Sequence, residues 1–458
     1  IAICAAHHAA ERSIKMGLTF KGGVFPLHTI HEGKNLTNNC AISVMPAGKI
    51  VKIPLSQHVG APALPIVEVG QKVKMGQKIA EAQGFVSVPI HASVSGTVTD
   101  ITTIMNLNGK PVGAIVIEND FADESDYLPV EKIDALTKEE ILAIIKDAGN
   151  VGMGGAAFPT HVKLSPPENK KVNLLIVNGA ECEPFLTADY RLMMECSKKI
   201  MLGVKIIMRA LDIKKAIIGI EDNKPDAIDK MAGEIDTHAI RVSPVQTKYP
   251  QGSEKQLIDA ITGRIVPSGG LPMDVGVVVV NIASVKAIAD AFYVGEPLIR
   301  RVVTVTGAVQ KPQNLLVRIG TSVQEVLDFV GGPVGEPLKI ISGGPMMGLP
   351  VPSMDCVITK GFSGLLVLDK TYTKKEKETN CIKCGKCAEV CPLHLMPMIL
   401  SASAANEDFE KAEKNHALDC MSCGCCSFIC PAKKPIAQNI KFAKEQIMIL
   451  RMKEKENQ

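Results

Sequence analysis

The chain contains no tryptophan, and only 4% of its 458 residues are aromatic. Flat side chains on which nucleotide bases could stack are therefore scarce. The formal net charge is only +3, whereas a nucleic-acid-binding domain usually carries a strongly basic face. The scarcity of aromatic residues and the nearly balanced charge together argue against a nucleic-acid-binding protein.

Long apolar runs are also missing. A helix needs roughly 18–20 apolar residues to cross a bilayer, and the longest candidate, residues 275–283, is short and rich in β-branched residues. We interpret this run as a buried strand. The chain is therefore not expected to cross a membrane by itself, although peripheral association is compatible with its sequence.

The sequence does not begin with methionine. Residues 1–15 have neither the features of a signal peptide nor those of a fold element, so we interpret them as a leader, a cloning remnant or an extension, with Met16 as a candidate start. The rest, with 46% apolar and 22% charged residues, has the composition of a globular protein with room for three or four domains.

Cysteine carries the most information about function. Eight of the 14 cysteines fall in two runs of the form C-x2-C-x2-C-x3-C-P. The runs are Cys381, Cys384, Cys387 and Cys391, followed by Cys420, Cys423, Cys426 and Cys430. In bacterial ferredoxins three thiolates of such a run bind one [4Fe–4S] cluster, and the fourth thiolate binds the other cluster.

This pattern predicts two [4Fe–4S] clusters with crossed ligands. The expected ligand sets are Cys381, Cys384, Cys387 and Cys430 for one cluster, and Cys420, Cys423, Cys426 and Cys391 for the other. Structural zinc and disulfides are the alternatives, but zinc takes four ligands per site and usually separates its two cysteine pairs more widely. Clusters need reducing, iron-supplying surroundings, which indicates the cytoplasm.

Residues 50–120 consist of short β-type runs broken by glycine and proline, a pattern typical of a small all-β unit. They resemble the barrel-sandwich hybrid of lipoyl and biotinyl domains. A true carrier has a modified lysine at a hairpin tip, and the equivalent stretch here, residues 85–89, contains no lysine. We therefore favour a structural or docking role over a carrier function.

A glycine-rich loop follows a predicted helix. Thr137 and Glu140 have the spacing of a capping box, which marks a helix start. Gly152, Gly154 and Gly155 come after that helix, and a loop of this kind that opens a helix lets backbone N–H groups approach a phosphate. The dinucleotide fingerprint has similar spacing but should follow a strand. From the residues alone, a flexible turn is an equal alternative.

This region, together with the strand expected at residues 172–178, resembles the flavin- and NADH-binding subunit of respiratory complex I and related NAD-linked hydrogenase and formate dehydrogenase subunits. The resemblance implies that FMN is held by Gly152, Gly154, Gly155, Lys163, Asn178, Glu181 and Asn281. It implies that NADH is contacted by Phe158, Glu183 and Glu254. Three positions depart from the family: Met153 replaces an arginine, Ala180 an aspartate and Ser253 a glutamate.

Residues 302–368 predict a further β unit, with a strand at 302–309, a helix at 322–330 and glycine-rich turns at 343–348. The unit resembles the soluble-ligand-binding β-grasp module that follows the flavin domain in complex I relatives. Met346 and Met347 are interpreted as core or loop packing.

The order of these parts resembles the C subunit of the Rnf complex over almost the whole chain. The expected fold class is multidomain α/β and β, combining a barrel-sandwich hybrid, an α/β flavin/NADH-binding domain, a β-grasp module and a helical two-[4Fe–4S] ferredoxin domain. The expected boundaries are an N-terminal extension at 1–49, then 50–120, 121–298, 299–370 and 371–440 for these four units, and a helical tail at 441–458.

The resemblance implies a peripheral electron-transfer subunit of a membrane ion-translocating ferredoxin:NAD oxidoreductase. Hydride would be exchanged with NAD(H) at FMN, and single electrons would pass through two [4Fe–4S] clusters. It also implies membrane and iron–sulfur subunits as partners, ferredoxin as an indirect partner, no nucleic acid, and a place at the cytoplasmic face of the cell membrane. The alternatives are the cobalamin reductase of propanediol-utilisation compartments, which shares this layout, and a non-catalytic polyferredoxin adaptor.

Six cysteines lie outside the cluster runs: Cys4, Cys40, Cys182, Cys196, Cys356 and Cys425. Cys182 stands between two candidate site glutamates and is interpreted either as a small buried residue, which we favour, or as redox-active. Residues 441–458 predict an amphipathic helix that either contacts lipid or another protein of the complex or is a solvated end.

Overall fold

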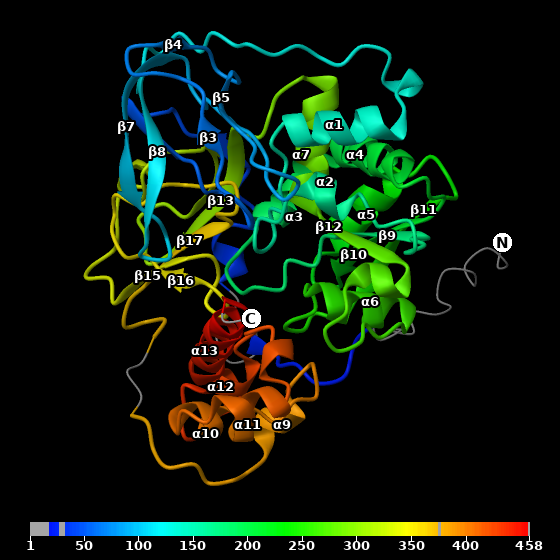
Figure 1. Ribbon diagram of the computed structural model, residues 1–458, viewed down its shortest axis with the longest axis vertical. Coiled ribbons are helices and arrows are strands. Elements are labelled where there is room, and N and C mark those ends of the chain that lie inside the picture. The colour runs from blue at the N-terminus through cyan, green and yellow to red at the C-terminus, as the bar shows by residue number, and fades with distance from the viewer. Residues whose placement is uncertain (1–17, 27–32, 374–376, 457–458) are drawn as a thin grey trace, which may run out of the picture.

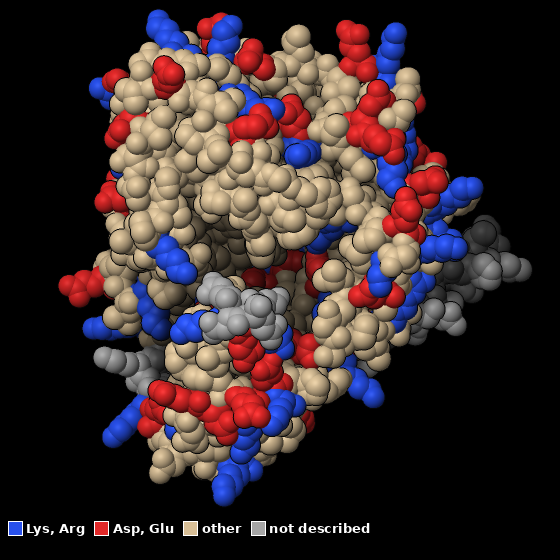
Figure 2. Space-filling model, in the orientation of Figure 1, with Lys and Arg blue, Asp and Glu red and all other residues tan. Residues whose placement is uncertain are grey.

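The computed structural model describes residues 18–26, 33–373 and 377–456 (Figure 1). The predicted leader, residues 1–15, Cys4 and Met16 lie outside these ranges. An all-β unit, a parallel α/β unit, a mixed β unit and a helical unit follow one another. Figure 2 shows charged side chains of both signs over the face in view, which is hollowed near its centre. Within the described ranges, each helix is too short or too polar to cross a membrane.

The first unit packs two small antiparallel sheets together, with strand orders β2-β8-β7-β4 and β3-β5-β6. Its strands are β2 (Ile50–Pro54), β3 (Leu64–Pro65), β4 (Lys72–Val73), β5 (Lys78–Glu81), β6 (Ile90–His91), β7 (Gly96–Met105) and β8 (Pro111–Asn119). Alternate residues of β2 and β8, including Val51, Ile53, Ile115 and Ile117, are fully buried in one core. This period of two is what a strand with one buried face requires.

The second unit is a parallel sheet with strand order β11-β10-β9-β12 and helices on both faces (Figure 1). Its strands are β9 (Leu174–Asn178), β10 (Ala216–Glu221), β11 (Ile240–Val245) and β12 (Val277–Asn281). Its helices are α1 (Lys138–Asp147), α2 (Thr160–Lys163), α3 (Ala188–Glu195), α4 (Ser197–Ala210), α5 (Pro225–Gly233), α6 (Glu254–Thr262) and α7 (Ile282–Tyr293). Alternate valines of β12 enter separate cores on the two faces, which explains its uninterrupted apolar run.

The strand order contains one reversal. The chain moves from β9 to β10 and β11 on one side, and then places β12 on the other side of β9. The connections that follow β9 and β12 therefore run in opposite directions from neighbouring strand ends. In α/β sheets of this kind, ligands bind outside the carboxyl ends of the strands at such a reversal.

One local expectation is confirmed, and one needs correction. Thr137 and Glu140 form the predicted capping box at the start of α1. The run 275–283 contains β12 but already ends in α7, because the side chain of Asn281 caps that helix. The helix expected after the glycine loop, α2, is a single turn ending at Lys163, and two prolines follow at 166 and 167.

The third unit is a six-stranded sheet of order β1-β14-β13-β17-β15-β16 with one helix. Its elements are β1 (Ile42–Val44), β13 (Arg300–Gly307), β14 (Gln313–Arg318), α8 (Val323–Phe329), β15 (Lys339–Ser342), β16 (Leu349–Pro350) and β17 (Gly364–Leu368). Strand β1 comes from the residues expected to form an N-terminal extension, and it pairs in parallel with β14.

The fourth unit is helical and lies at the bottom of Figure 1 in orange and red. It contains α9 (Lys386–Glu389), α10 (Pro397–Ala405), α11 (Phe409–Lys414), α12 (Cys425–Ile429) and α13 (Ile436–Glu456). Helix α13 begins before the expected residue 441 and buries Ile436, Ile440, Ala443 and Ile447 in the core of this unit. Its first three turns are therefore a packed part of the unit.

Candidate functional site

Two asparagines stand side by side at the reversal of the parallel sheet. Asn178 ends β9 and Asn281 ends β12, and the two residues are paired in the sheet register. Asn178 Nδ2 donates to Gly252 O at 2.7 Å, and Asn281 Nδ2 donates to Asp189 Oδ2 at 2.7 Å. The topology thus brings together two residues predicted to hold a flavin, at the edge where such sheets bind ligands.

The glycine loop lies against the same edge. Gly152 N donates to Phe158 O at 2.8 Å and closes the loop. A Cβ atom on Gly154 would stand 2.6 Å from Asn281 Nδ2, whereas a Cβ atom on Gly155 would meet no atom within 4 Å. The loop therefore has one side in contact with Asn281 and one open side.

Met153 anchors this loop to the sheet. It is buried, and its N–H group donates to Ser284 Oγ in α7 at 2.8 Å. This departure from the expected arginine therefore serves packing. Because α2 is a single turn, an anion bound here would be held by the N–H groups of the loop and not by a helix dipole.

Lys163 and Glu254, which the sequence assigned to different ligands, form an ion pair. Lys163 Nζ also donates to the carbonyl oxygen of Val279 at 3.0 Å, so the pair is attached to strand β12. A phosphate group that approached Lys163 would compete with the Glu254 carboxylate for the same ammonium group.

Glu181 shapes the loop after β9. Its carboxylate accepts hydrogen bonds from Asp189 N at 2.7 Å and Tyr190 N at 3.2 Å, which satisfies N–H groups in the first turn of α3. Its backbone is left-handed, with φ 50°, a conformation that costs energy for a non-glycine residue. Burial and the nearby Glu181 charge raise the pKa of Asp189 to about 7.

Glu183 connects the same loop to the mixed β unit. Its carboxylate accepts hydrogen bonds from Met346 N at 3.1 Å and Met347 N at 2.8 Å. Burial raises the pKa of Glu183 to about 7. The two methionines, predicted to serve packing, also contribute backbone donors to this acidic group.

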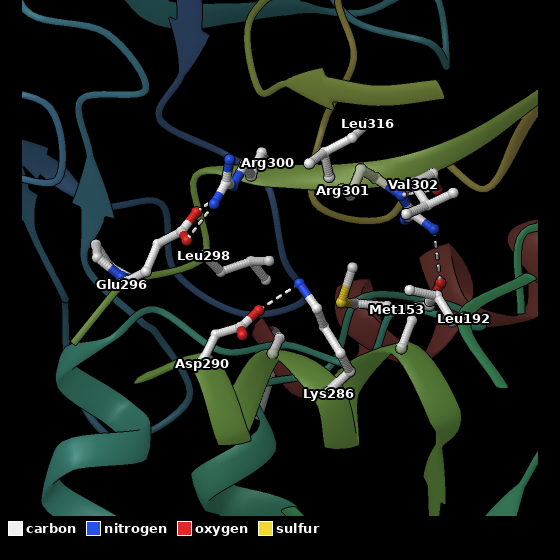
Figure 3. Close-up of a pocket in the computed structure, with 13 residues that line it drawn as sticks. Met153, Leu192, Lys286, Asp290, Glu296, Leu298, Arg300, Arg301, Val302 and Leu316 are labelled. Carbon is white, nitrogen blue, oxygen red and sulfur yellow. Dashed lines mark hydrogen bonds and ion pairs between the residues drawn. The ribbon is translucent and has the colours of Figure 1, made fainter. Parts of the chain in front are cut away.

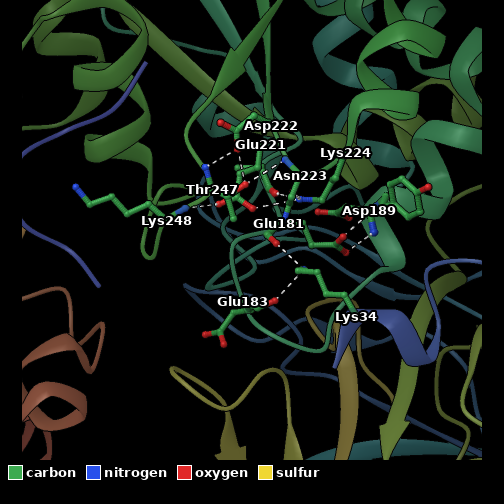
Figure 4. Close-up of polar contacts among 12 residues, drawn as sticks. Lys34, Glu181, Glu183, Asp189, Glu221, Asp222, Asn223, Lys224, Thr247 and Lys248 are labelled. Carbon is green, nitrogen blue, oxygen red and sulfur yellow. Dashed lines mark hydrogen bonds and ion pairs between the residues drawn. The ribbon is translucent and has the colours of Figure 1, made fainter. Parts of the chain in front are cut away.

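The loop at residues 179–187, from which both glutamates project, is held by two buried lysines (Figure 4). Lys34 Nζ donates to three carbonyl oxygens, of Glu181 at 2.8 Å, Glu183 at 3.0 Å and Leu186 at 2.6 Å. Burial lowers the pKa of Lys34. Lys224 Nζ donates to Ala180 O at 2.7 Å and pairs with Glu221 at 3.2 Å. Sequence reasoning missed both lysines, because no motif marks them.

A pocket behind the glycine loop is structural (Figure 3). Met153 lines it together with charged side chains of α7, of β13 and of the connection between them. These charges pair with one another: Lys286 with Asp290, and Arg300 with Glu296. The pocket therefore borders the loop at Met153, and these four charges are already paired within the protein.

A second cavity, of about 320 Å³, lies at the ends of β10 and β11. Cys182, Glu221, Asn223, Lys248 and Tyr249 are among the residues that line it. Burial raises the pKa of Cys182, so its thiol is not activated in this state. Cys182 also lies beside Gly252, where a Cβ atom would approach its sulfur to 3.2 Å.

The crossed cysteine sets stay a prediction from the spacing, and the structure describes the surroundings of each set. Cys391 lines one cavity together with Cys420, Cys423 and Cys426. Among the described residues, no three His, Cys, Asp or Glu side chains lie close enough together to hold a single metal ion. The four thiols border the cavity between them. We call this set the covered half.

The second set is Cys381, Cys384, Cys387 and Cys430, which we call the open half. The Cys387 and Cys430 thiols lie close enough to interact electrostatically. Lys434, which pairs with Glu378 at 2.7 Å, lies within electrostatic range of Cys381 and Cys430. Cys381 and Cys384 are exposed, whereas Cys387 and Cys430 are buried. In the open half, Cys387 and Cys430 thus face the core of the helical unit, and Cys381 and Cys384 face solvent.

The covered half is packed against the α/β unit. Tyr249 OH donates to Cys423 O at 2.8 Å, and the Cys425 thiol donates to Tyr249 O at 3.9 Å. Tyr249 and Cys182 belong to the same apolar cluster as Cys423 and Cys425. Cys182, which directly follows the predicted flavin residue Glu181 in the chain, is therefore packed in the same cluster as the covered half.

An N-terminal strap, residues 18–24, crosses this interface. Gln246 N donates to Leu18 O at 2.9 Å, and Val24 exchanges backbone hydrogen bonds with Tyr249. On its other side, Gly23 N donates to Val390 O at 2.8 Å. The strap thus ties the α/β unit to the helical unit.

Both candidate sites fit their cofactors. Burial raises the pKa of the Cys391 and Cys420 thiols, and that of Cys426 to about 12, so these buried thiolates need the positive charge that iron supplies. The open side of the glycine loop, between Gly155 and the paired asparagines, has the N–H and amide donors that a phosphorylated flavin requires.

A ligand site for a flavin at the edge of a parallel sheet, packed directly on a unit with two sets of four cysteines, defines the chain as an electron carrier of the flavin and iron–sulfur class. Family models match in the order of the units: the RnfC barrel sandwich hybrid domain at residues 18–122, the Nuo51 FMN-binding domain at 145–290, the SLBB domain at 302–350 and the 4Fe-4S dicluster domain at 380–434.

Curated relatives identify the family. Over 430 residues the chain is 50% identical to the C subunit of the proton-translocating ferredoxin:NAD(+) oxidoreductase complex of Clostridium ljungdahlii, covering 93% of each chain. Over 445 residues it is 45% identical to the C subunit of the Na(+)-translocating complex of Acetobacterium woodii, covering 96% of this chain and 99% of the relative. It is 43% identical to the C subunit of the ion-translocating oxidoreductase complex of Rhodobacter capsulatus, covering 93% and 82%. The chain belongs to this family of C subunits, and the expected fold class and cofactor types are confirmed.

Proposed function

We propose that this chain is the NAD(H)-reacting subunit of an ion-translocating ferredoxin:NAD oxidoreductase complex, bound peripherally at the cytoplasmic face of the cell membrane. Its partners would be the membrane and iron–sulfur subunits of that complex, with ferredoxin as an indirect partner. The printed names of the relatives support this interpretation. The observation that carries it is the Tyr249–Cys423 hydrogen bond, which joins a unit with a candidate flavin site to a cysteine loop.

The glycine loop and the two asparagines would hold FMN. When bound, FMN supplies the ability to take an electron pair as hydride and to release the electrons singly. Gly154 and Gly155 would present backbone N–H groups to its phosphate, and Gly152 would keep the loop closed through its hydrogen bond to Phe158 O. Lys163 would add charge after separating from Glu254. Asn178, Asn281 and Glu181 would hold the polar parts of the flavin.

Phe158, Glu183 and Glu254 would contact the nicotinamide nucleotide. With a pKa of about 7, Glu183 can be neutral or ionised near physiological pH, and so can either donate a hydrogen bond to the nucleotide or accept one. A hydrogen bond to a charged group contributes roughly 1.5–3 kcal/mol. Glu183→Gln should therefore slow NADH-driven reduction about ten- to a hundredfold while flavin stays bound.

The covered half would hold the cluster nearer to the flavin, and the open half the more distant cluster. This order follows from the contacts of Cys423 and Cys425 with Tyr249 and from the exposure of Cys381 and Cys384. We also propose the unit boundaries predicted from the sequence, near residues 50, 121, 299 and 371.

The test uses the full chain with FMN and iron–sulfur clusters reconstituted anaerobically. NADH should bleach the flavin absorbance and then reduce the clusters, with Glu183→Gln slowed at the first stage only. Added to membranes from a strain that lacks the gene for this chain, the protein should restore ferredoxin-dependent NAD+ reduction. If dithionite reduces the bound flavin but NADH does not, the proposal is wrong.

Its place on the membrane has a separate test. Because each described helix is too short or too polar to cross a membrane, we expect high salt or a mild chaotrope to release the protein from native membranes. Release by detergent alone would contradict attachment through the other proteins of the complex.

A further inference from the structure

The two cysteine loops of the helical unit repeat one backbone conformation. Matching residues of the two loops have nearly equal left-handed φ angles: 56° at Lys383 and 57° at Ser422, then 77° at Gly385 and 80° at Gly424. Each loop also directs a backbone N–H group at its first sulfur, at 3.4 Å in both cases. The two halves can therefore be compared position by position.

The comparison shows one loop covered and the other bare. A Cβ atom on Gly424 would stand 3.0 Å from Met346 O, whereas one on the equivalent Gly385 would meet no atom within 4 Å. Ile382 has 68% of its surface exposed, while its counterpart Met421 is partly buried against the α/β unit. The covered loop thus shows how this backbone packs against another protein surface, and the open loop presents the same surface without a neighbour in the described residues.

The two loops also differ in charge. From Cys420 to Cys430 the covered loop contains no charged residue. The open loop carries exposed Lys383 and Lys386, and its first acidic residue is Glu389. Two lysines beside an exposed apolar side chain are suited to steering an acidic protein into contact.

We propose that the open cluster face, defined as Cys381, Ile382, Lys383, Cys384, Gly385 and Lys386, docks an electron-transfer protein with acidic residues around its redox centre. Ile382 would form the apolar centre of the contact, and the two lysines would orient the partner. One electron would pass from the reduced centre of the donor to the oxidised centre of the acceptor, and no bond would be made or broken. Either the partner protein or this chain could be the donor. This inference rests on the proposed electron-transfer function.

The test measures electron entry from two donors of opposite charge. The reconstituted chain is mixed in a stopped-flow instrument with NAD+ and either a photoreduced acidic two-cluster ferredoxin or the methyl viologen radical cation, and NADH formation is followed. The open-face variants are Lys383→Glu/Lys386→Glu and, as a neutral pair that tolerates the left-handed backbone at 383, Lys383→Asn/Lys386→Gln. The control pair is Lys411→Glu/Lys441→Glu, which reverses two exposed lysines elsewhere in the helical unit.

At low ionic strength the glutamate pair should slow electron entry from ferredoxin at least tenfold, the neutral pair should slow it less, and the control pair should change it by less than about twofold. These differences should shrink in about 0.5 M salt, because screening weakens steering. Electron entry from methyl viologen should not be slowed.

Three results would overturn the docking proposal: ferredoxin rates that do not change, equal losses in the control pair, or equal losses with methyl viologen. The last would mean that the lysines act on the cluster itself. Failure of the proposed function looks different, because NADH would then not form from either donor even in the unaltered chain. Iron content measured on every variant excludes loss of the clusters as the cause.

Discussion

Lys34→Met tests whether the loop at residues 179–187 must be held in place before FMN can bind. The loop includes two non-glycine residues with left-handed backbones, Glu181 at φ 50° and Phe185 at φ 70°. Such conformations persist only where surrounding contacts enforce them. Methionine keeps the length and apolar character of the lysine side chain but cannot donate to the three carbonyl groups.

The magnitude follows from those three hydrogen bonds, which measure 2.6–3.0 Å. A buried acceptor that loses its donor costs about 1–3 kcal/mol. Even at about 1 kcal/mol for each carbonyl group, the loop conformation is destabilised by about 3 kcal/mol. If FMN binds only to the native loop, its Kd should rise roughly a hundredfold.

The assay is a titration of FMN into the apoprotein, followed by quenching of flavin fluorescence. Lys214→Met, which removes an exposed lysine of the same unit, should bind FMN as the unaltered chain does. If Lys34→Met binds FMN within about threefold of the unaltered chain, the loop does not depend on the ammonium group and the reasoning is refuted.

Three further predictions concern the same sites. Gly154→Val should lose FMN, because its side chain would collide with the Asn281 amide at the end of β12. Gly233→Val, at an open position, should keep FMN. Retention of FMN by Gly154→Val would refute the role of this loop. Iron analysis should find about eight irons in the unaltered chain. EPR should show one damaged cluster in Cys420→Ser and two intact clusters in Cys425→Ser. A zinc site or a single cluster in the unaltered chain would refute the assignment. Burial raises the pKa of Glu183 from 4.5 to about 7, so the folded protein binds this proton more tightly than the unfolded chain does. The thermal midpoint should therefore decrease as the pH is raised from 5 to 7. Glu183→Gln should flatten that profile, and an unchanged profile would contradict the assigned pKa.

Local sequence patterns were sufficient where the structure depends on nearby residues. The capping box at Thr137 and Glu140 is a short-range feature, and it forms as expected. The cysteine spacing indicated two clusters because three ligands of each cluster come from one short loop. The confirmed fold class likewise followed from patterns within each unit.

Contacts between distant segments were not readable in the sequence. Lys34 acts on a loop about 150 residues away, and neither end of that interaction lies in a recognisable motif. Similarly, the pairing of Lys163 with Glu254 depends on the position of β12 beside β9, which only the assembled sheet provides. The length of α2 was not predicted, because a glycine loop indicates where a helix begins and not where it ends.

The N-terminal strap has a consequence for biosynthesis. Residues 18–24 leave the ribosome well before their partners Tyr249 and Val390, which follow more than 200 residues later. The α/β unit and the cysteine loops can therefore each mature, and even acquire cofactors, before the strap closes over both. An affinity tag fused close to residue 18 would therefore disturb a contact that forms after both units have folded. Flavin and iron contents would stay normal, while electron transfer between the flavin and the clusters would be slower.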